Sequence, residues 1–401
     1  MKNQRVLIIG ALVVLAVAAF FFSQKQTKVS DIKVGIILGF TGPIESLTPD
    51  MASGAELAFK EATESGDLLG GANIIPLRAD STCVDSAAAS TAAEDLIAQG
   101  IVAIMGADCS GVTGAIATNV AVPNGVVMVS PSATSPGLTD LDDNGLFFRT
   151  APSDARGGEV LADITKDNGV SSVAITYVNT DYGVGLADVY KASLEANGIT
   201  VTTVTAHEGD KADYSAEVGV LSSAGGDALA VLGYLDQGGN QIIQGSLDSG
   251  AFDTFVLSDG MIGDSLTDTF GSDLDNSFGS MPGSLGEGAQ MFTKYAEENG
   301  VNPSVYVGES YDAAALIILA MQAGESTDKS SIAANIMNVA NGPGEKIMAG
   351  ELSKGLKLLA DGKSIDYQGA TDVSFTDVGE AFGLFIEKGI ENGKFVNVSQ
   401  R

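Results

Sequence analysis

Residues Ile32-Lys33-Val34-Gly35-Ile36-Ile37-Leu38 form an apolar, β-branched run, and a stretch with helical spacing follows from about Met51 to Ser65. β-branched residues favour strands, because their side chains pack well on a pleated surface. A strand that is apolar on both faces is typical of a parallel sheet covered by helices on each side. This first unit therefore predicts an α/β fold.

The same unit repeats along the chain. Further strands are predicted at residues 73–77, 101–105, 126–130, 173–178, 201–205, 228–232 and 255–258, with helices at 87–99, 159–167, 184–195 and 216–223. After Gly283 the pattern changes to helices at residues 287–299, 310–323, 329–339 and 346–360, and a final strand is predicted at 382–386. Alternating strands and helices predict parallel sheets, and a length of 401 residues suits two α/β domains.

The composition excludes several classes of protein. Hydrophobic residues make up 45% of the chain and charged residues 18%, so the chain can bury cores and is not disordered. The formal net charge of −30 would repel nucleic acid and anionic lipid, which are also negative. A small molecule or another protein remains as the expected partner.

The N-terminal residues predict export. Lys2 and Arg5 flank an apolar run over residues 6–22, which is typical of a signal sequence. The run is long for a signal peptide and short for a membrane span. Residues 1–25 are therefore expected to be either a cleaved signal peptide or a retained N-terminal anchor, and the protein is expected to be periplasmic or otherwise extracytoplasmic.

The two cysteines, Cys83 and Cys109, suggest one disulfide in an exported chain, with two unrelated buried thiols as the alternative. The only histidine is His207, so two sulfurs would lack the other ligands of a tetrahedral zinc site. No metal and no cofactor are expected.

The sequence Gly263-Asp264-Ser265-Leu266 matches the motif around the nucleophilic serine of lipases and esterases. The only histidine, His207, precedes this motif, whereas in those hydrolases the histidine follows it, so the serine lacks a general base in the expected order. We therefore expect no catalysis.

Several short motifs occur in an order that resembles the leucine/isoleucine/valine-binding proteins, a family of periplasmic substrate-binding proteins. The resemblance covers residues 31–396 and rests on the opening strand and turn at 32–43, the loops at 106–110 and 130–139, and the later motifs at 181–185, 233–234 and 309–314. Cys83 and Cys109 resemble the disulfide pair of the family in context and separation. Each motif is short, and their common order makes the resemblance specific.

The resemblance implies a two-lobed α/β fold of the type I periplasmic binding protein class. Each lobe would be a parallel sheet with helices on both faces, and the chain would cross between lobes near Thr150, Pro282 and Tyr367. Lobe one would hold residues 31–149 and 283–366, and lobe two would hold residues 150–282 and 367–401.

The resemblance also places the carboxylate of a ligand in lobe one. Ser110 and Thr134 would contact this carboxylate, Ala133 lies in the same loop, and the carbonyl of Ser132 would accept from the ligand's ammonium group. Ser110 follows a predicted strand and opens a helix, so its hydroxyl and the first N–H groups of the helix could hold an anion. Ordinary helix capping is the alternative for Ser110 and Thr134.

Lobe two would supply aromatic rings and an acid. Tyr182 and Tyr234 each follow a predicted strand and could close over the ligand, or could simply pack between lobes. Asp259 matches an acid of the family that pairs with the α-ammonium group, and a solvated loop aspartate is the alternative. The chain has Ser46-Leu47-Thr48 where the family often has an aromatic residue, which leaves the side-chain preference open.

The implied function is capture of an amino acid, branched-chain or similar, in the cleft between the lobes. The protein would deliver it to the permease subunits of an ABC importer and would act as a monomer. There are two alternatives: uptake of a small amide or carboxylate, and ligand sensing by a membrane-anchored domain.

Overall fold

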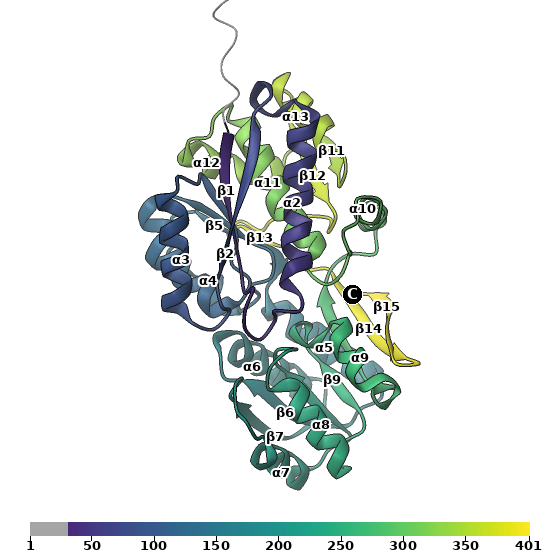
Figure 1. Cartoon of the computed structure of the whole chain (residues 1–401). Helices are drawn as coiled ribbons and strands as arrows, with labels where there is room; N and C mark the ends of the chain where they lie inside the picture. Colours follow the sequence, from purple (N-terminus) through teal and green to yellow (C-terminus); the bar gives the residue numbers. More distant parts are fainter. Residues whose placement is uncertain (1–30) are drawn as a thin grey trace, which may run out of the picture.

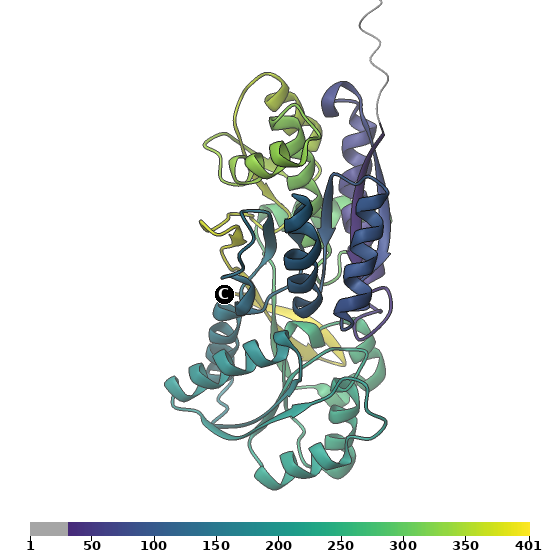
Figure 2. The same cartoon turned by 90° about the vertical axis from the view of Figure 1, so that its left-hand side faces the viewer.

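The computed structural model describes residues 31–401, so the predicted signal peptide or anchor lies outside the described residues. Two α/β lobes lie one above the other and give an elongated molecule (Figures 1 and 2). Within residues 31–401, none of the helices combines the length and the apolar character that crossing a membrane requires. The predicted two-lobed α/β fold is confirmed.

Lobe one is built on a six-stranded sheet in which all neighbours are parallel. Its strands, in spatial order, are β13 (Glu380–Ala381), β5 (Phe147–Pro152), β4 (Val127–Ser130), β3 (Ala103–Gly106), β1 (Asp31–Leu38) and β2 (Asn73–Asp80). β3, β4 and β5 are buried at every position. This explains why they read as continuous apolar runs rather than as alternating patterns.

Helices cover both faces of this sheet. α2 (Thr48–Ser65) packs on α11 (Val307–Ala323), and α3 (Ser86–Ala98) packs on α4 (Ser110–Ile116). α11 is apolar around most of its surface because it lies between the sheet, α2, α12 (Lys329–Ala340) and α13 (Leu352–Ala360). The lobe is completed by α10 (Glu287–Glu298) and the parallel pair β11 (Glu345–Met348) and β12 (Ile365–Gly369).

Lobe two is built on a seven-stranded sheet. Its strands, in spatial order, are β15 (Lys394–Gln400), β14 (Phe385–Glu391), β10 (Phe278–Pro282), β9 (Phe255–Leu257), β8 (Ala228–Leu232), β6 (Ser172–Val178) and β7 (Thr200–His207). Five strands are parallel, but β14 and β15 run antiparallel at one edge, so this sheet is mixed rather than purely parallel. The short turn between β14 and β15 permits only an antiparallel pair.

The helices of lobe two also form two layers. α5 (Asp154–Asp167) packs on α6 (Asp181–Ala196), whereas α7 (Ser215–Ala224) packs on α8 (Gly239–Ser249). α6 connects strands in one direction across the sheet, and α7 and α8 connect them in the opposite direction. Right-handed crossovers in opposite directions place their helices on opposite faces.

The chain passes between the two sheets three times. The passages lie between β5 and α5, between β10 and α10, and between β13 and β14. The third passage therefore follows Ala381 and does not lie near Tyr367, where we expected it. Tyr367 is in β12 and its hydroxyl donates to Asp312 of α11 at 2.6 Å, which keeps this segment in lobe one.

All three passages border a small cavity at the hinge. The cavity has a volume of about 40 Å³, and its lining includes Thr150 and Pro152 from the end of β5, where the first passage begins, Gly283 from the second passage, Leu384 from the third, and Glu309 from α11. Burial raises the pKa of Glu309 to about 8, and the nearby Asp312 adds to the shift. Among residues 31–401, no basic side chain pairs with Glu309. A neutral Glu309 is therefore compatible with the packed hinge.

We predict that the free energy of unfolding of Glu309→Gln falls less steeply than that of the wild type as the pH rises from about 4.5 to about 8. The folded pKa of about 8 exceeds the ordinary value of 4.5, so the folded protein keeps a proton that the unfolded chain releases between these values. Wild-type stability should thus fall with rising pH across this window, and the neutral amide should lessen the fall. Urea unfolding at several pH values measures it. The exposed Glu297→Gln should keep the wild-type pH dependence, and a Glu309→Gln variant that does the same would contradict the prediction.

A disulfide joins the ends of two loops beside the lobe-one sheet. Cys83 follows β2 and Cys109 precedes α4, with their Cα atoms 5.1 Å apart. The disulfide that the resemblance implied is therefore confirmed. It closes a loop of 26 residues and fixes the start of α4, where Ser110 lies.

We predict that replacing both cysteines by serine lowers the free energy of unfolding by about 3–4 kcal/mol, since a loop of this size costs that much in chain entropy to close. Urea unfolding of the variant and of the oxidised wild type measures the difference. Thiol counting on denatured, unreduced protein is the control and should find no free thiol. Equal stabilities of the two proteins would contradict the prediction.

Candidate ligand-binding site

Residues from both lobes enclose a cavity between the two sheets. Five of the residues singled out from the sequence line it: Ser110, Ser132, Tyr182, Tyr234 and Asp259. The remaining lining residues are Ile44, Leu47, Met51, Asp108, Cys109, Gly260 and Tyr306. The cavity has a volume of about 20 Å³, on the order of one water molecule, so an amino acid would require the lobes or side chains to move.

Asp259 is the polar centre of this cavity. It follows β9 in lobe two and is 7% exposed. The hydroxyl of Tyr182 donates to its Oδ1 at 2.5 Å, and the hydroxyl of Tyr306, from lobe one, donates to its Oδ2. Burial raises the pKa of Asp259, while the two hydroxyls oppose that shift. The carboxyl group of Asp259 thus bridges the lobes.

Tyr306 was not identified from the sequence. It precedes α11 with a φ of 62°, a left-handed conformation that is unusual for a bulky side chain. Such strained backbone often occurs at functional sites. The segment around Tyr306 has no strand pattern, and only the closure of the two lobes brings its hydroxyl to Asp259.

The two tyrosines of lobe two form one wall. The rings of Tyr182 and Tyr234 are stacked with centroids 5.2 Å apart. Gly260 lies against them, and a Cβ atom at this position would lie 2.5 Å from the carbonyl oxygen of Gly233. The close packing requires glycine here and leaves one flat aromatic surface facing lobe one.

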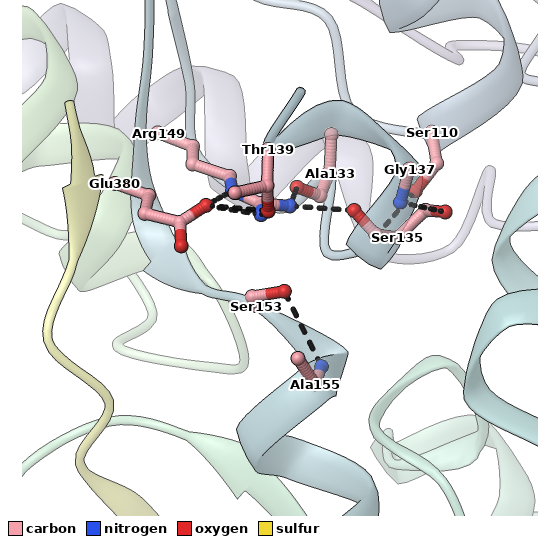
Figure 3. A network of polar contacts seen from close by, with 9 residues as sticks. All are labelled: Ser110, Ala133, Ser135, Gly137, Thr139, Arg149, Ser153, Ala155 and Glu380. Carbon is pink, nitrogen blue, oxygen red and sulfur yellow. Dashed lines mark hydrogen bonds and ion pairs between the residues drawn. The ribbon is translucent and has the colours of Figure 1, made fainter. Parts of the chain in front are cut away.

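The two loops of lobe one are joined to each other. Ser110 opens α4, and its hydroxyl accepts from the N–H of Ser135 at 3.1 Å (Figure 3). The Ser130 hydroxyl accepts from the N–H of Ala133 at 3.0 Å. Ser132, between these contacts, lines the cavity. Ala133 and Thr134 are buried directly behind it and do not line the cavity.

Two buried polar atoms beside these loops lack hydrogen bonds. They are Oγ1 of Thr134 and Oδ2 of Asp154, and neither has a partner of normal geometry among the described residues. The backbone N–H of Asp154 donates to the carbonyl of Thr134 at 2.8 Å, so the two residues are neighbours. Burial and the charge of Asp259 raise the pKa of Asp154 well above its ordinary value, while the Thr134 side chain and the charge of Arg149 oppose the shift. Asp154 was not identified from the sequence, where it lies before the helix predicted at residues 159–167; in the structure it is the first residue of α5.

The site is acidic and has no base in its lining. Asp108 is buried, and burial raises its pKa although the Gly39 N–H and the Ser81 hydroxyl both donate to it. Together with Asp154 and Asp259, it makes three buried carboxyl groups in and beside the cavity. None of the described residues that line the cavity is Lys, Arg or His. A ligand with a positive group would offset this charge.

An apolar surface from lobe one faces the tyrosines. Ile44 and Leu47 come from the first turn and Met51 from α2, and all three are buried. The sequence singled out Leu47 only as a departure from the family's aromatic position. The structure places a branched aliphatic side chain there, which favours an aliphatic group on the ligand.

The lobes also contact each other at both sides of the cavity. The Ser46 N–H donates to the Asp236 carboxylate at 2.9 Å, and the Ser135 hydroxyl donates to the carbonyl of Asp181 at 3.0 Å.

A larger groove of about 730 Å³ lies next to the cavity and shares Leu47 with it. The acid, the stacked tyrosines and the joined loops meet in the small cavity and not in this groove.

Comparison with curated proteins gives relatives with related names. Leu/Ile/Val-binding protein homolog 3 of Brucella melitensis is 34% identical over 52% of this chain and 56% of that protein. Leu/Ile/Val-binding protein homolog 1 of the same organism is 29% identical over 76% of this chain and 81% of that protein. The match with the first relative thus spans little more than half of its length.

Solved structures share the fold. The leucine-binding protein LivK of Thermotoga maritima aligns with a TM-score of 0.76 at 23% identity, covering 92% of this chain and 98% of that chain. The Streptococcus pneumoniae LivJ protein in complex with isoleucine aligns with a TM-score of 0.76 at 20% identity, covering 93% and 99%. The sequence profile of the periplasmic binding protein family matches residues 31–348. The resemblance seen in the sequence is confirmed, and the chain belongs to the periplasmic binding protein family.

Proposed function

We propose that this protein captures an amino acid between its lobes and presents it to the permease subunits of an ATP-driven importer. One observation carries the proposal: a buried carboxyl group, Asp259, lies among tyrosines in a cavity whose lining has no basic residue. An ammonium group is the natural partner of such an acid, because it offsets the cost of the buried charge. The names of the curated relatives, which are Leu/Ile/Val-binding proteins, support it.

The two ends of a zwitterion fit different walls. The ammonium group would bind Asp259 and the carbonyl of Ser132. The carboxylate would accept from the Ser110 hydroxyl, from the first N–H groups of α4, and from the Thr134 hydroxyl once the cavity extends to it. An aliphatic side chain would pack on Leu47 and its neighbours. This arrangement favours branched-chain amino acids.

The alternatives fit the site less well. A simple carboxylate would bring a further negative charge beside the acids Asp108, Asp154 and Asp259, and the cavity lining has no base to pair with it. An amide lacks the charge that Asp259 would prefer. A ligand-sensing domain would use the same cavity and would differ by keeping residues 1–25 as a membrane anchor.

We further propose that the protein is an exported, non-catalytic monomer. Nδ1 of His207 lies 2.8 Å from the Thr176 hydroxyl in lobe two. No hydrogen bond joins His207 to Ser265 among the described residues, and burial lowers the pKa of His207 to about 4. The hydrolase-like sequence around Ser265 is therefore not part of a Ser–His pair in this conformation.

We predict that wild-type protein binds L-leucine and that Asp259→Asn weakens this binding by about tenfold or more, because a charge-assisted hydrogen bond is lost. Calorimetry measures both affinities. The deaminated analogue 4-methylpentanoate is the control ligand, and it should bind the variant no worse than wild type. Equal losses for both ligands would make Asp259 structural. Preference of the wild type for 4-methylpentanoate would replace the amino-acid proposal by the carboxylate alternative.

We predict that Thr134→Val weakens L-leucine binding and does not lower stability. Oγ1 of Thr134 has no hydrogen bond of normal geometry among the described residues, although its side chain lies close enough to the Asp154 carboxyl group to lower the pKa of that group. Its removal should therefore cost little stability, whereas a lost bond to the ligand carboxylate costs roughly 1.5–3 kcal/mol. Calorimetry and urea unfolding measure the two effects.

The matched control is Thr165→Val. Thr165 is equally buried, but its hydroxyl bonds to the Leu161 carbonyl at 2.7 Å and lies 2.9 Å from the Tyr190 hydroxyl. This variant should lose stability and keep its affinity. A Thr134→Val variant that behaves in the same way would remove Thr134 from the binding site.

A further inference from the structure

Arg149 is a buried cation with a complete set of partners. It lies in β5 and is 1% exposed. Its two Nη1 hydrogens go to the carbonyls of Ala133, at 3.0 Å, and Ser135, at 2.9 Å. Nε and Nη2 donate to Oε2 of Glu380 at 3.2 and 2.5 Å, and Nη2 also donates to the Thr139 hydroxyl at 2.9 Å (Figure 3). All five N–H groups of the guanidinium are therefore paired.

Among the described residues, Glu380 is the only carboxylate hydrogen-bonded to Arg149, whose charge also lowers the pKa of the buried Asp154. Oε2 of Glu380 also accepts from the Thr139 hydroxyl at 3.0 Å. Arg149 cannot lose its charge, so its burial depends on Glu380. The two residues come from strands at the edge of the lobe-one sheet, β5 and β13. Each strand leads directly into a passage between the lobes.

The network ends on the loop that borders the ligand cavity. Arg149 holds the carbonyls on both sides of Thr134. The N–H of Ser135 donates to the Ser110 hydroxyl, and the Ser135 hydroxyl donates to Asp181 in lobe two. Asp181 directly precedes Tyr182 of the cavity. A continuous set of contacts thus runs from the edge strands through the loop to the opposite lobe.

We propose that Arg149 and Glu380 are positioning residues, which hold the loop of residues 133–139 in the geometry that binds the ligand carboxylate and meets lobe two. A guanidinium suits this role because its rigid fork fixes two carbonyls at once, which a lysine cannot do. Neither residue lines the cavity, so they act through the loop. For ligand affinity, the proposal rests on the function proposed above.

The test compares two variants. Glu380→Gln removes the anion and keeps the side-chain shape. Arg149→Met combined with Glu380→Leu removes both charges, so no unpaired charge stays buried and the fold is retained even if the single variant does not fold. In both variants, amide hydrogen exchange of residues 133–139, measured against the amides of β1, should become faster by about tenfold or more. Calorimetry with L-leucine should show a similar loss of affinity.

An ion pair in lobe two, in which Arg401 is more exposed than Arg149 and also pairs with Asp167, provides the control. Glu387 in β14 accepts from Arg401 at 2.6 and 2.9 Å and from the Ser399 hydroxyl at 2.8 Å. Glu387→Gln, and Arg401→Met combined with Glu387→Leu, should change neither loop exchange nor affinity. If Arg149 and Glu380 had a purely structural role, a double variant that is as stable as the wild type would also show wild-type loop exchange and wild-type affinity.

The outcomes separate the two proposals. Wild-type exchange in the 133–139 loop of the double variant, or full affinity in that variant, would overturn the positioning role. If the wild type does not bind L-leucine, the branched-chain part of the proposed function fails, and the exchange comparison, which uses no ligand, still decides the positioning role.

Discussion

The arrangement of the cavity follows from one constraint: the carboxyl group of Asp259 is buried between the two lobes, and none of the described residues that line the cavity is basic. A buried carboxylate must be protonated, hydrogen-bonded or paired with a cation. Here Tyr182 and Tyr306 supply the hydrogen bonds, and they come from different lobes. The same interaction that satisfies the acid therefore also holds the lobes together, so that closure and the chemistry of the site are coupled.

Parallel sheets bring these groups together. Ser110 follows β3, Ser132 follows β4, Tyr182 follows β6 and Asp259 follows β9. Parallel strands end at a common edge, so loops that are far apart in the sequence meet at that edge. Two such sheets, facing each other across three passages, give a site with one wall from each lobe. Opening at the hinge would separate the walls without changing either of them.

The sequence allowed the buried strands and most of the site to be predicted, because a parallel strand is apolar on both faces. The predicted helix at residues 346–360 was wrong at its start, because residues 346–348 belong to β11, a short strand that pairs only with β12 and has two exposed positions that break the strand pattern. Tyr306 and Asp154 were missed for another reason. Each has an ordinary local sequence, and its role arises from contacts with residues about 50 to 100 positions away.

The charges around the site divide between two kinds of arrangement. Arg149 is fully paired inside the fold, so its positive charge is committed to Glu380 and to two carbonyls of the loop. No cation is hydrogen-bonded to Asp154 or Asp259 among the described residues, although the charge of Arg149 partly opposes the raised pKa of Asp154, and the two carboxyl groups repel each other when ionised. A proton can neutralise one of them, but an ammonium group does so while adding charge-assisted hydrogen bonds. Under the proposed function, the site would therefore select first for positive charge, and the apolar wall at Leu47 would then select among the molecules that carry it.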